Sequence, residues 1–171
     1  MDEKKQKTKS EVEIRYTNLD DSSYLKKWLE DPEVLKIGFT MSEPAEIEDA
    51  VKHWIGFSNY KSSLTATIEG KPVGIATLCL MPYRKLIHHC LLSIIVSKDL
   101  CGQGIGTLLM NNIIHLAKNY FGIEVLYLEV YENNPAIRLY ERFGFREIGF
   151  QKHFMKDNDK YIGKVIMERV L

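Results

Sequence analysis

The stretch that decides the fold reads Ser93-Ile94-Ile95-Val96-Ser97-Lys98-Asp99-Leu100-Cys101-Gly102-Gln103-Gly104-Ile105-Gly106-Thr107. It begins as an apolar strand at 93–96 and passes through three closely spaced glycines into a helix. Glycine lacks a Cβ, so its backbone adopts φ > 0 easily and successive N–H groups can point at an anion. The positive end of the helix dipole lies at the same place. The junction predicts a phosphate-binding loop, with an ordinary tight turn as the alternative.

The downstream sequence decides between these two interpretations. A second strand is expected at 125–130, and the chain then reads Asn133-Asn134-Pro135-Ala136-Ile137-Arg138-Leu139-Tyr140-Glu141-Arg142-Phe143-Gly144-Phe145. Together with the glycine loop, this segment resembles the GNAT superfamily of acyl-CoA-dependent N-acetyltransferases. The specific part of the resemblance covers 93–145. In addition, the segment 28–34 resembles the helix pair of the branch that contains ribosomal-protein N-terminal and polyamine acetyltransferases.

The length and composition of the chain favour one domain. A chain of 171 residues with 45% apolar residues can bury a sizeable core. We expect a flexible tail at 1–10 and a single domain at 11–171. No run of 18 apolar residues exists, and the first seven residues lack the apolar centre of a signal peptide. We therefore expect a soluble cytoplasmic protein with no membrane partner.

Cysteine and charge patterns narrow the function further. Cys79, Cys90 and Cys101 have no CxxC spacing, so we expect free thiols and no metal site. A formal net charge of zero argues against nucleic acid as a partner. Between residues 18 and 50, however, nine acidic residues accompany three lysines. These acids are either solvated helix residues or an acidic approach for a cationic substrate.

Apolar periodicity predicts the order of the elements. Strands are expected at 12–16, 64–69, 73–81, 89–96, 125–130, 146–154 and 161–169, with a turn at Gly70-Lys71. Helices are expected from Asp20-Asp21-Ser22 to about 31–32, from about Ser42, from Gly104 to about Tyr120, and at 135–143. This order indicates an α+β protein. The resemblance implies a GNAT-like fold, in which a central mixed, mostly antiparallel sheet has a splayed parallel strand pair and flanking helices.

The resemblance also implies acetyl-CoA as cosubstrate, with its pyrophosphate on the glycine loop. The residues expected to bind it there are Cys101, Gly102, Gln103, Gly104, Ile105, Gly106 and Thr107. The family motif begins with Arg or Gln, and this chain has Cys101 at that position. A side-chain contact to phosphate is therefore missing, but main-chain donors at the helix N-terminus remain.

The strand before the loop is expected to act through its main chain. In the family, the strand that matches Ser93, Ile94, Ile95 and Val96 splays from the next strand, so the pantetheine arm lies between them. A backbone N–H directed at the thioester oxygen stabilises the developing negative charge by roughly 3 kcal/mol. The apolar side chains of this strand are expected to be core residues.

Tyr140 and Asn133 match two further family positions. The resemblance implies that Tyr140 is the general acid for the departing thiolate, and a phenol with a pKa near 10 suits that role. The alternative is an amphipathic core tyrosine. Asn133, or Asn134 if the alignment slides by one residue, is expected to bond the pantetheine amide. Either asparagine can instead cap the helix that Pro135 opens.

The general base is the least defined part of the prediction. Glu129 is the first candidate because it lies on the strand beside the cofactor slot, although an exposed structural glutamate is the alternative. Glu132 and Asp31 are weaker candidates. His88 and His89 are interpreted as surface or core residues at the start of the central strand.

Rival functions fit less well. A dinucleotide-binding G-x-G-x-x-G motif needs glycine at Thr107, and no P-loop motif occurs. The main alternative is an acyl-CoA-binding sensor or interaction module without transfer activity. The resemblance implies an N-acetyltransferase that acts directly on the primary amine of a small, polyamine-like molecule or a protein N-terminus. A homodimer is common among relatives.

Overall fold

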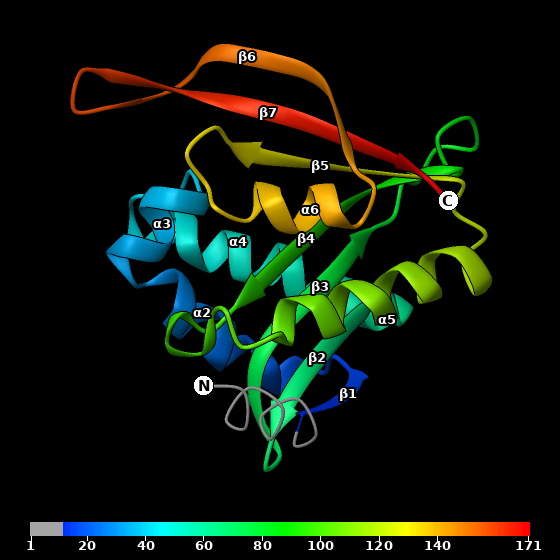
Figure 1. Cartoon of the computed structure of the whole chain (residues 1–171). Coiled ribbons are helices and arrows are strands. Elements are labelled where there is room, and N and C mark those ends of the chain that lie inside the picture. The colour runs from blue at the N-terminus through cyan, green and yellow to red at the C-terminus, as the bar shows by residue number, and fades with distance from the viewer. Residues whose placement is uncertain (1–11) are drawn as a thin grey trace.

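The computed structural model describes residues 12–171, and the expected tail at 1–10 lies outside these residues. One seven-stranded sheet runs through them in the order β1-β2-β3-β4-β5-β7-β6 (Figure 1). All neighbouring strands are antiparallel except β4 and β5, which confirms the mixed, mostly antiparallel sheet. The strands are β1 (Val12–Tyr16), β2 (Ser63–Ile68), β3 (Lys71–Cys79), β4 (His89–Val96), β5 (Val125–Tyr131), β6 (Arg146–Asp157) and β7 (Lys160–Val170).

Helices cover both faces of the sheet (Figure 1). One face carries α2 (Ser22–Leu29), α3 (Pro32–Gly38) and α4 (Pro44–Gly56), and the other carries α5 (Ile105–Asn119) and α6 (Ile137–Arg142). Three 3₁₀ turns complete the order, at Leu19–Asp21, Phe57–Tyr60 and Lys98–Leu100. Among residues 12–171, no helix is both long and apolar enough to cross a membrane.

The sheet separates two apolar clusters because successive strand side chains point to opposite faces. The larger cluster lies under α5 and includes Leu109 and Ile113 together with Leu126 and Leu128 of β5. The smaller one joins α2 and α4 to Ile75 and Ile95 of the two central strands. Neighbouring residues of β4 therefore anchor different helix layers, which fixes this strand in the middle of the molecule.

The main difference from the sequence prediction is α3. Its apolar residues are only partly buried, so the segment has little of the periodicity that reveals a helix. Asp31 and Pro32 were expected to end the preceding helix, but they also begin this one. The Asp31 side chain accepts the Glu33 N–H at 2.9 Å, and Pro32 follows as the first helical residue.

Smaller differences concern element ends and one side chain. The β2–β3 turn is centred on Glu69 and Gly70, both with positive φ, and is thus one residue earlier than expected. The β6–β7 hairpin is longer than expected because pairing continues to Asp157 and Lys160. Leu108, an apolar residue of the expected helix from 104 to 120, is only half-buried on α5.

Candidate active site

The two parallel strands separate after a short contact. The pairing of β4 with β5 joins only His89–Leu91 to Val125–Tyr127, whereas β4 stays paired with β3 as far as Val96. From Leu92 to Val96 the edge of β4 that faces β5 therefore has backbone N–H and C=O groups with no strand partner in the described chain. This confirms the expected splayed pair. The gap between the two strand backbones, here called the slot, is bordered by these polar main-chain groups and suits an extended chain bearing amide groups.

Side chains of the three apolar residues among the four predicted strand residues pack in the core. Ile95 is 5% exposed and packs under α2 and α4. Ile94 and Val96 pack on the α5 side, and Ser93 is half-buried on the face of Ile95. Contact between the main chain of this strand and a ligand stays a prediction.

The glycine loop forms an open cradle at the start of α5. Gly102 and Gly104 have φ values of 75° and 89°, and Gly104 is the residue before the first helical turn. A Cβ built on either glycine meets no atom within 4 Å, so space lies above the loop. The backbone N–H groups of Ile105, Gly106 and Thr107 have no intrahelical acceptors because they begin the helix. The cradle therefore suits a phosphate group.

The other residues of the loop have structural roles. The Cys101 thiol turns back toward the Ser97 carbonyl oxygen, 3.6 Å away, and burial followed by the negative charge of Asp99 raises its pKa. Gln103 donates to the Asp99 carbonyl at 3.4 Å. Neither side chain takes over the contact of the missing Arg or Gln, so the cradle depends on its main chain. Gly106 packs closely against α6, because a Cβ there would lie 3.3 Å from Leu139 Cδ2.

Tyr140 lies on α6, on the face of the sheet that α5 covers. Its side chain is 8% exposed and packs edge-on against Phe145, with 6.2 Å between ring centroids. Burial raises the pKa of Tyr140 to about 12. Its hydroxyl makes no hydrogen bond to another residue of the described chain. Tyr140 is thus protonated at neutral pH, with a proton that no neighbouring residue holds.

The two asparagines have different surroundings. Asn134 is half-buried, and its Oδ1 accepts the Ala136 N–H at 2.9 Å at the entry to α6. This bond holds the turn that leads into α6, whereas Ala136 occupies the N-cap position and neither asparagine caps the helix. Asn133 is exposed, so its amide remains the better candidate for contacting a ligand.

The candidate general bases differ in their hydrogen-bond partners. Glu129 lies on the β5 face opposite Leu128 and accepts a hydrogen bond from Lys164 Nζ at 3.0 Å. Glu132 Oε1 accepts the Gly163 N–H at 2.8 Å, and Asp31 caps α3, which makes both of them structural residues. His88 is exposed and His89 packs against Tyr127, in agreement with their structural interpretation.

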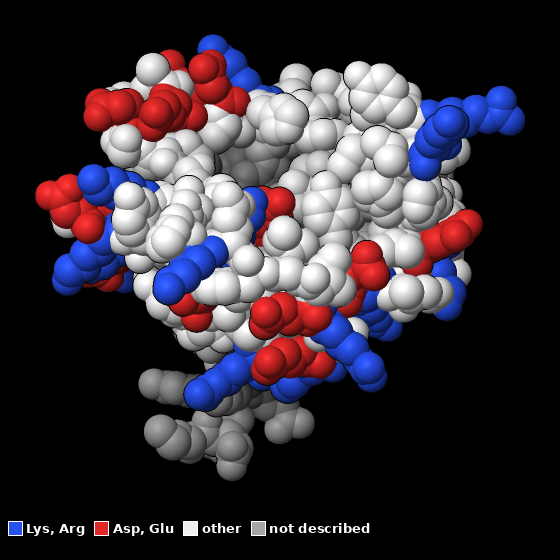
Figure 2. Space-filling view, turned by 90° about the horizontal axis from the view of Figure 1, so that it is seen from above, with Lys and Arg blue, Asp and Glu red and all other residues white. Residues whose placement is uncertain are grey.

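Four of the nine acidic residues between 18 and 50 are paired with lysines. Lys98, just before the glycine loop, contacts Glu33 and lies 3.6 Å from Asp31. Lys26 lies 3.1 Å from Glu48. Viewed from the β6 side, red and blue side chains lie mainly around the margin, while the centre is largely uncharged and hollowed (Figure 2). Such pairing weakens the attraction that this region would exert on a polycation.

Lys164 and the aromatic residues around it were not among the site residues predicted from the sequence. Lys164 is 11% exposed, and its ammonium lies 4.0 Å from the centre of the Phe154 ring. Tyr131, directly opposite on β5, is 5% exposed and donates to Met155 Sδ at 3.6 Å. The alternation of β7 places Lys164 on the face opposite Val165. This alternation can be read from the sequence, but only the pairing of β7 with β5 places Lys164 beside Glu129.

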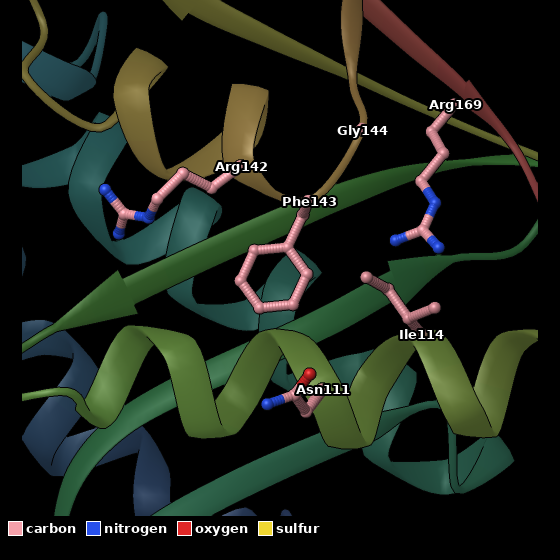
Figure 3. Close-up of a pocket in the computed structure, with 6 residues that line it drawn as sticks. All are labelled: Asn111, Ile114, Arg142, Phe143, Gly144 and Arg169. Atoms are coloured by element: carbon pink, nitrogen blue, oxygen red, sulfur yellow. The ribbon is translucent and has the colours of Figure 1, made fainter.

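A separate hollow of about 450 Å³ lies outside this site, between α5, the end of α6 and β7. Its lining residues are Asn111, Ile114, Arg142, Phe143, Gly144 and Arg169. The Phe143 ring lies between the two arginines, and the Arg142 side chain points away from Arg169 (Figure 3). None of the predicted site residues lines this hollow.

Comparison with known proteins agrees with this geometry. The model of the acetyltransferase (GNAT) family matches residues 20–145. An N-alpha-acetyltransferase of Sulfolobus acidocaldarius is 35% identical over 105 residues, which cover 61% of this chain and 51% of that protein. An L-amino acid N-acetyltransferase of Escherichia coli is 25% identical over 162 residues, which cover 94% of this chain and 99% of that protein. The chain thus spans only about half the length of the first relative.

Solved structures show the same fold. The ribosomal-protein-alanine N-acetyltransferase of Brucella melitensis has a TM-score of 0.76 at 25% identity, covering 93% of this chain and 99% of that one. A structure from Salmonella typhimurium, which contains acetyl-CoA as its cofactor, has a TM-score of 0.76 at 16% identity and covers 94% of both chains.

Proposed function

The chain belongs to the GNAT acetyltransferase family, and we propose that it transfers an acetyl group from acetyl-CoA directly to a primary amine. The observation that carries this proposal is the separation of β4 from β5 next to the open glycine cradle. An extended thioester arm fits the slot, and a pyrophosphate fits the start of α5. The acceptor is a small amine or a protein N-terminus.

Groups of this chain can be assigned to each catalytic step of the transfer. Acetyl-CoA supplies the acetyl group as a thioester. The free backbone N–H groups of β4 stabilise negative charge on its carbonyl oxygen. As the new C–N bond forms and the C–S bond breaks, Tyr140 gives its proton to the sulfur. An ammonium acceptor first gives one proton to Glu129 or to water. The proton that its nitrogen loses after the C–N bond has formed restores the Tyr140 hydroxyl, so charges and protons balance.

An acyl-CoA-binding module without transfer activity is the less favoured alternative. Such a module has no use for a buried, protonated tyrosine near the thiol. The proposal also includes a single domain at 11–171, a cytoplasmic location and a homodimer. Light scattering after size-exclusion chromatography tests the homodimer through the molar mass.

We expect acetyl-CoA to stabilise the protein. At a hundredfold excess over Kd, binding adds about 2.7 kcal/mol to the free energy of unfolding, or roughly 5 to 10 °C to the melting temperature. NADH is the control ligand, because it offers a pyrophosphate without a thioester arm. A shift with acetyl-CoA alone supports the proposal. No shift, or an equal shift with NADH, contradicts it.

Gly104→Val is expected to weaken acetyl-CoA binding by about 10- to 100-fold, the loss of one to two charge-assisted hydrogen bonds. The added side chain would occupy the open space over the cradle and strain a backbone with φ of 89°. Gly70→Val is the matched control, since Gly70 has φ of 77° and equally open space in a remote hairpin. Calorimetric titration measures both. An equal loss in both variants would mean that strain, rather than the cradle, sets the affinity.

A further inference from the structure

Glu129 and Lys164 form an ion pair beside the mouth of the slot. The carboxylate oxygen and the ammonium nitrogen are 3.0 Å apart, with the side chains 41% and 11% exposed. The Phe154 ring lies 4.0 Å from the ammonium, which therefore has an aromatic face on one side and a carboxylate on another. A nearly buried lysine held in this way has a defined position.

The pair lies on the acceptor side of the slot. Leu91 of β4 is directly opposite Tyr127 of β5, so the alternate residues Ser93 and Glu129 project from the same face of the sheet. Tyr140 and the start of α5 belong to the other face. A thioester arm in the slot has the cradle on one face, so an amine approaches from the face of Glu129.

Both charged groups have unused hydrogen-bonding capacity. An ammonium has three donors and a carboxylate about four acceptor positions. In the described chain, the only hydrogen bond of either group is the one they share. Of the nearby polar groups, Glu132 accepts from Gly163 and Tyr131 donates to Met155. The site therefore offers a carboxylate and an ammonium side by side, each with hydrogen-bonding positions left over.

We propose that the acceptor is a free α-amino acid, with its amine at Glu129 and its carboxylate at Lys164. This inference rests on the proposed function and names its substrate class. The amine nitrogen and the carboxylate carbon of an amino acid are about 2.5 Å apart, which suits two protein charges at 3.0 Å. A polyamine would place a second ammonium against Lys164. A protein N-terminus has a neutral amide where the carboxylate would be.

The first test needs only the wild-type protein. We compare kcat/KM for free L-amino acids with kcat/KM for the same amino acids as C-terminal amides, and add spermidine and an alanyl peptide. The amide removes the carboxylate charge and keeps the amine. We expect kcat/KM to fall about 10- to 100-fold for the amides, which is the loss of one charge-assisted hydrogen bond. Spermidine and the peptide should be similarly poor acceptors.

The second test uses variants of the lysine. In Lys164→Gln the ratio of kcat/KM for the amino acid to kcat/KM for its amide should fall to about one. The change should come mainly from KM of the acceptor, while the Kd of acetyl-CoA is unchanged. Lys164→Arg should restore much of the preference because it keeps the positive charge. Lys156→Gln is the control, since Lys156 lies on the same hairpin and pairs with Asp159 near the turn. Calorimetric binding of the amino acid to the CoA-bound protein gives a readout independent of turnover.

The outcomes separate this inference from the proposed function. The inference would be overturned if amides react as well as the free amino acids, or if spermidine or the peptide is preferred. Either result would leave the proposed acetyltransferase function standing. An unchanged acid preference in Lys164→Gln would also overturn it. Absence of transfer to every acceptor, with no thermal shift by acetyl-CoA, would overturn both.

Discussion

Replacing Tyr140 by phenylalanine is expected to lower kcat by about 10²- to 10⁴-fold, which is the usual contribution of a general acid. The Kd of acetyl-CoA should change by less than about twofold. Phenylalanine keeps the edge-on packing against Phe145 and removes only a hydroxyl that has no protein partner in the described chain. Stopped-flow thiol release measures turnover, and calorimetric titration measures binding.

The dependence of kcat on pH gives a second check on the role of Tyr140. Burial raises the pKa of Tyr140 to about 12, so the hydroxyl stays protonated throughout the range of assay. Tyr140 should therefore contribute no loss of kcat as the pH rises toward 10. Any rise of kcat with pH belongs to deprotonation of the amine or its base, and Tyr140→Phe should keep that rise at its lower rate.

Tyr120→Phe is the control for removal of a hydroxyl, since Tyr120 is 69% exposed at the end of α5. Its kcat should match the wild type. A Tyr140→Phe variant with near-normal kcat would exclude Tyr140 as the acid. A variant that loses acetyl-CoA binding would instead make Tyr140 a binding residue.

Local sequence signals predicted the central part of the fold well. The expected strand at 89–96 coincides with β4, and the expected helix from 104 to 120 contains α5. Both signals are strong because apolar periodicity and glycine chemistry agree there. The splay between β4 and β5 came from the family resemblance, and the short pairing at His89–Leu91 confirms it.

What the sequence could not predict depends on contacts between distant segments. The Glu129–Lys164 pair joins residues on two strands, and no local pattern reveals which residues become neighbours. The same holds for Asp21. Asp21 lies directly before α2, but its side chain makes no capping bond to this helix. It accepts hydrogen bonds from β1 and β2 instead.

Asp21 is the centre of a buried polar network that joins the first two strands to the helical layer. Its side chain is 2% exposed and forms two bonds with the Arg15 guanidinium, at 2.7 and 2.8 Å. It also accepts the Thr65 hydroxyl at 2.8 Å and the Asn18 N–H at 3.0 Å. Four donors thus depend on one carboxylate.

We expect Asp21→Ala to lower the free energy of unfolding by about 2 to 4 kcal/mol, or roughly 5 to 15 °C in melting temperature. The loss stays below that of a fully buried pair because the Arg15 side chain is 36% exposed and can be rehydrated. Asp20→Ala is the matched control, since the neighbouring Asp20 is exposed. Its melting temperature should stay within about 2 °C of the wild type.

The effect of Asp21→Ala should disappear in acid. Burial acts to raise the pKa of Asp21, but hydrogen bonds from Arg15, Asn18 and Thr65 outweigh it and hold the pKa below its usual value. A carboxyl group with a lowered folded-state pKa stabilises the fold above its unfolded pKa of about 3.9, and loses that effect as pH falls through the folded value. The gap between wild-type and Asp21→Ala melting temperatures should therefore be constant from pH 7 to 5 and narrow below about pH 4. A gap that persists unchanged at low pH would mean that lost packing, rather than the charged network, accounts for the destabilisation.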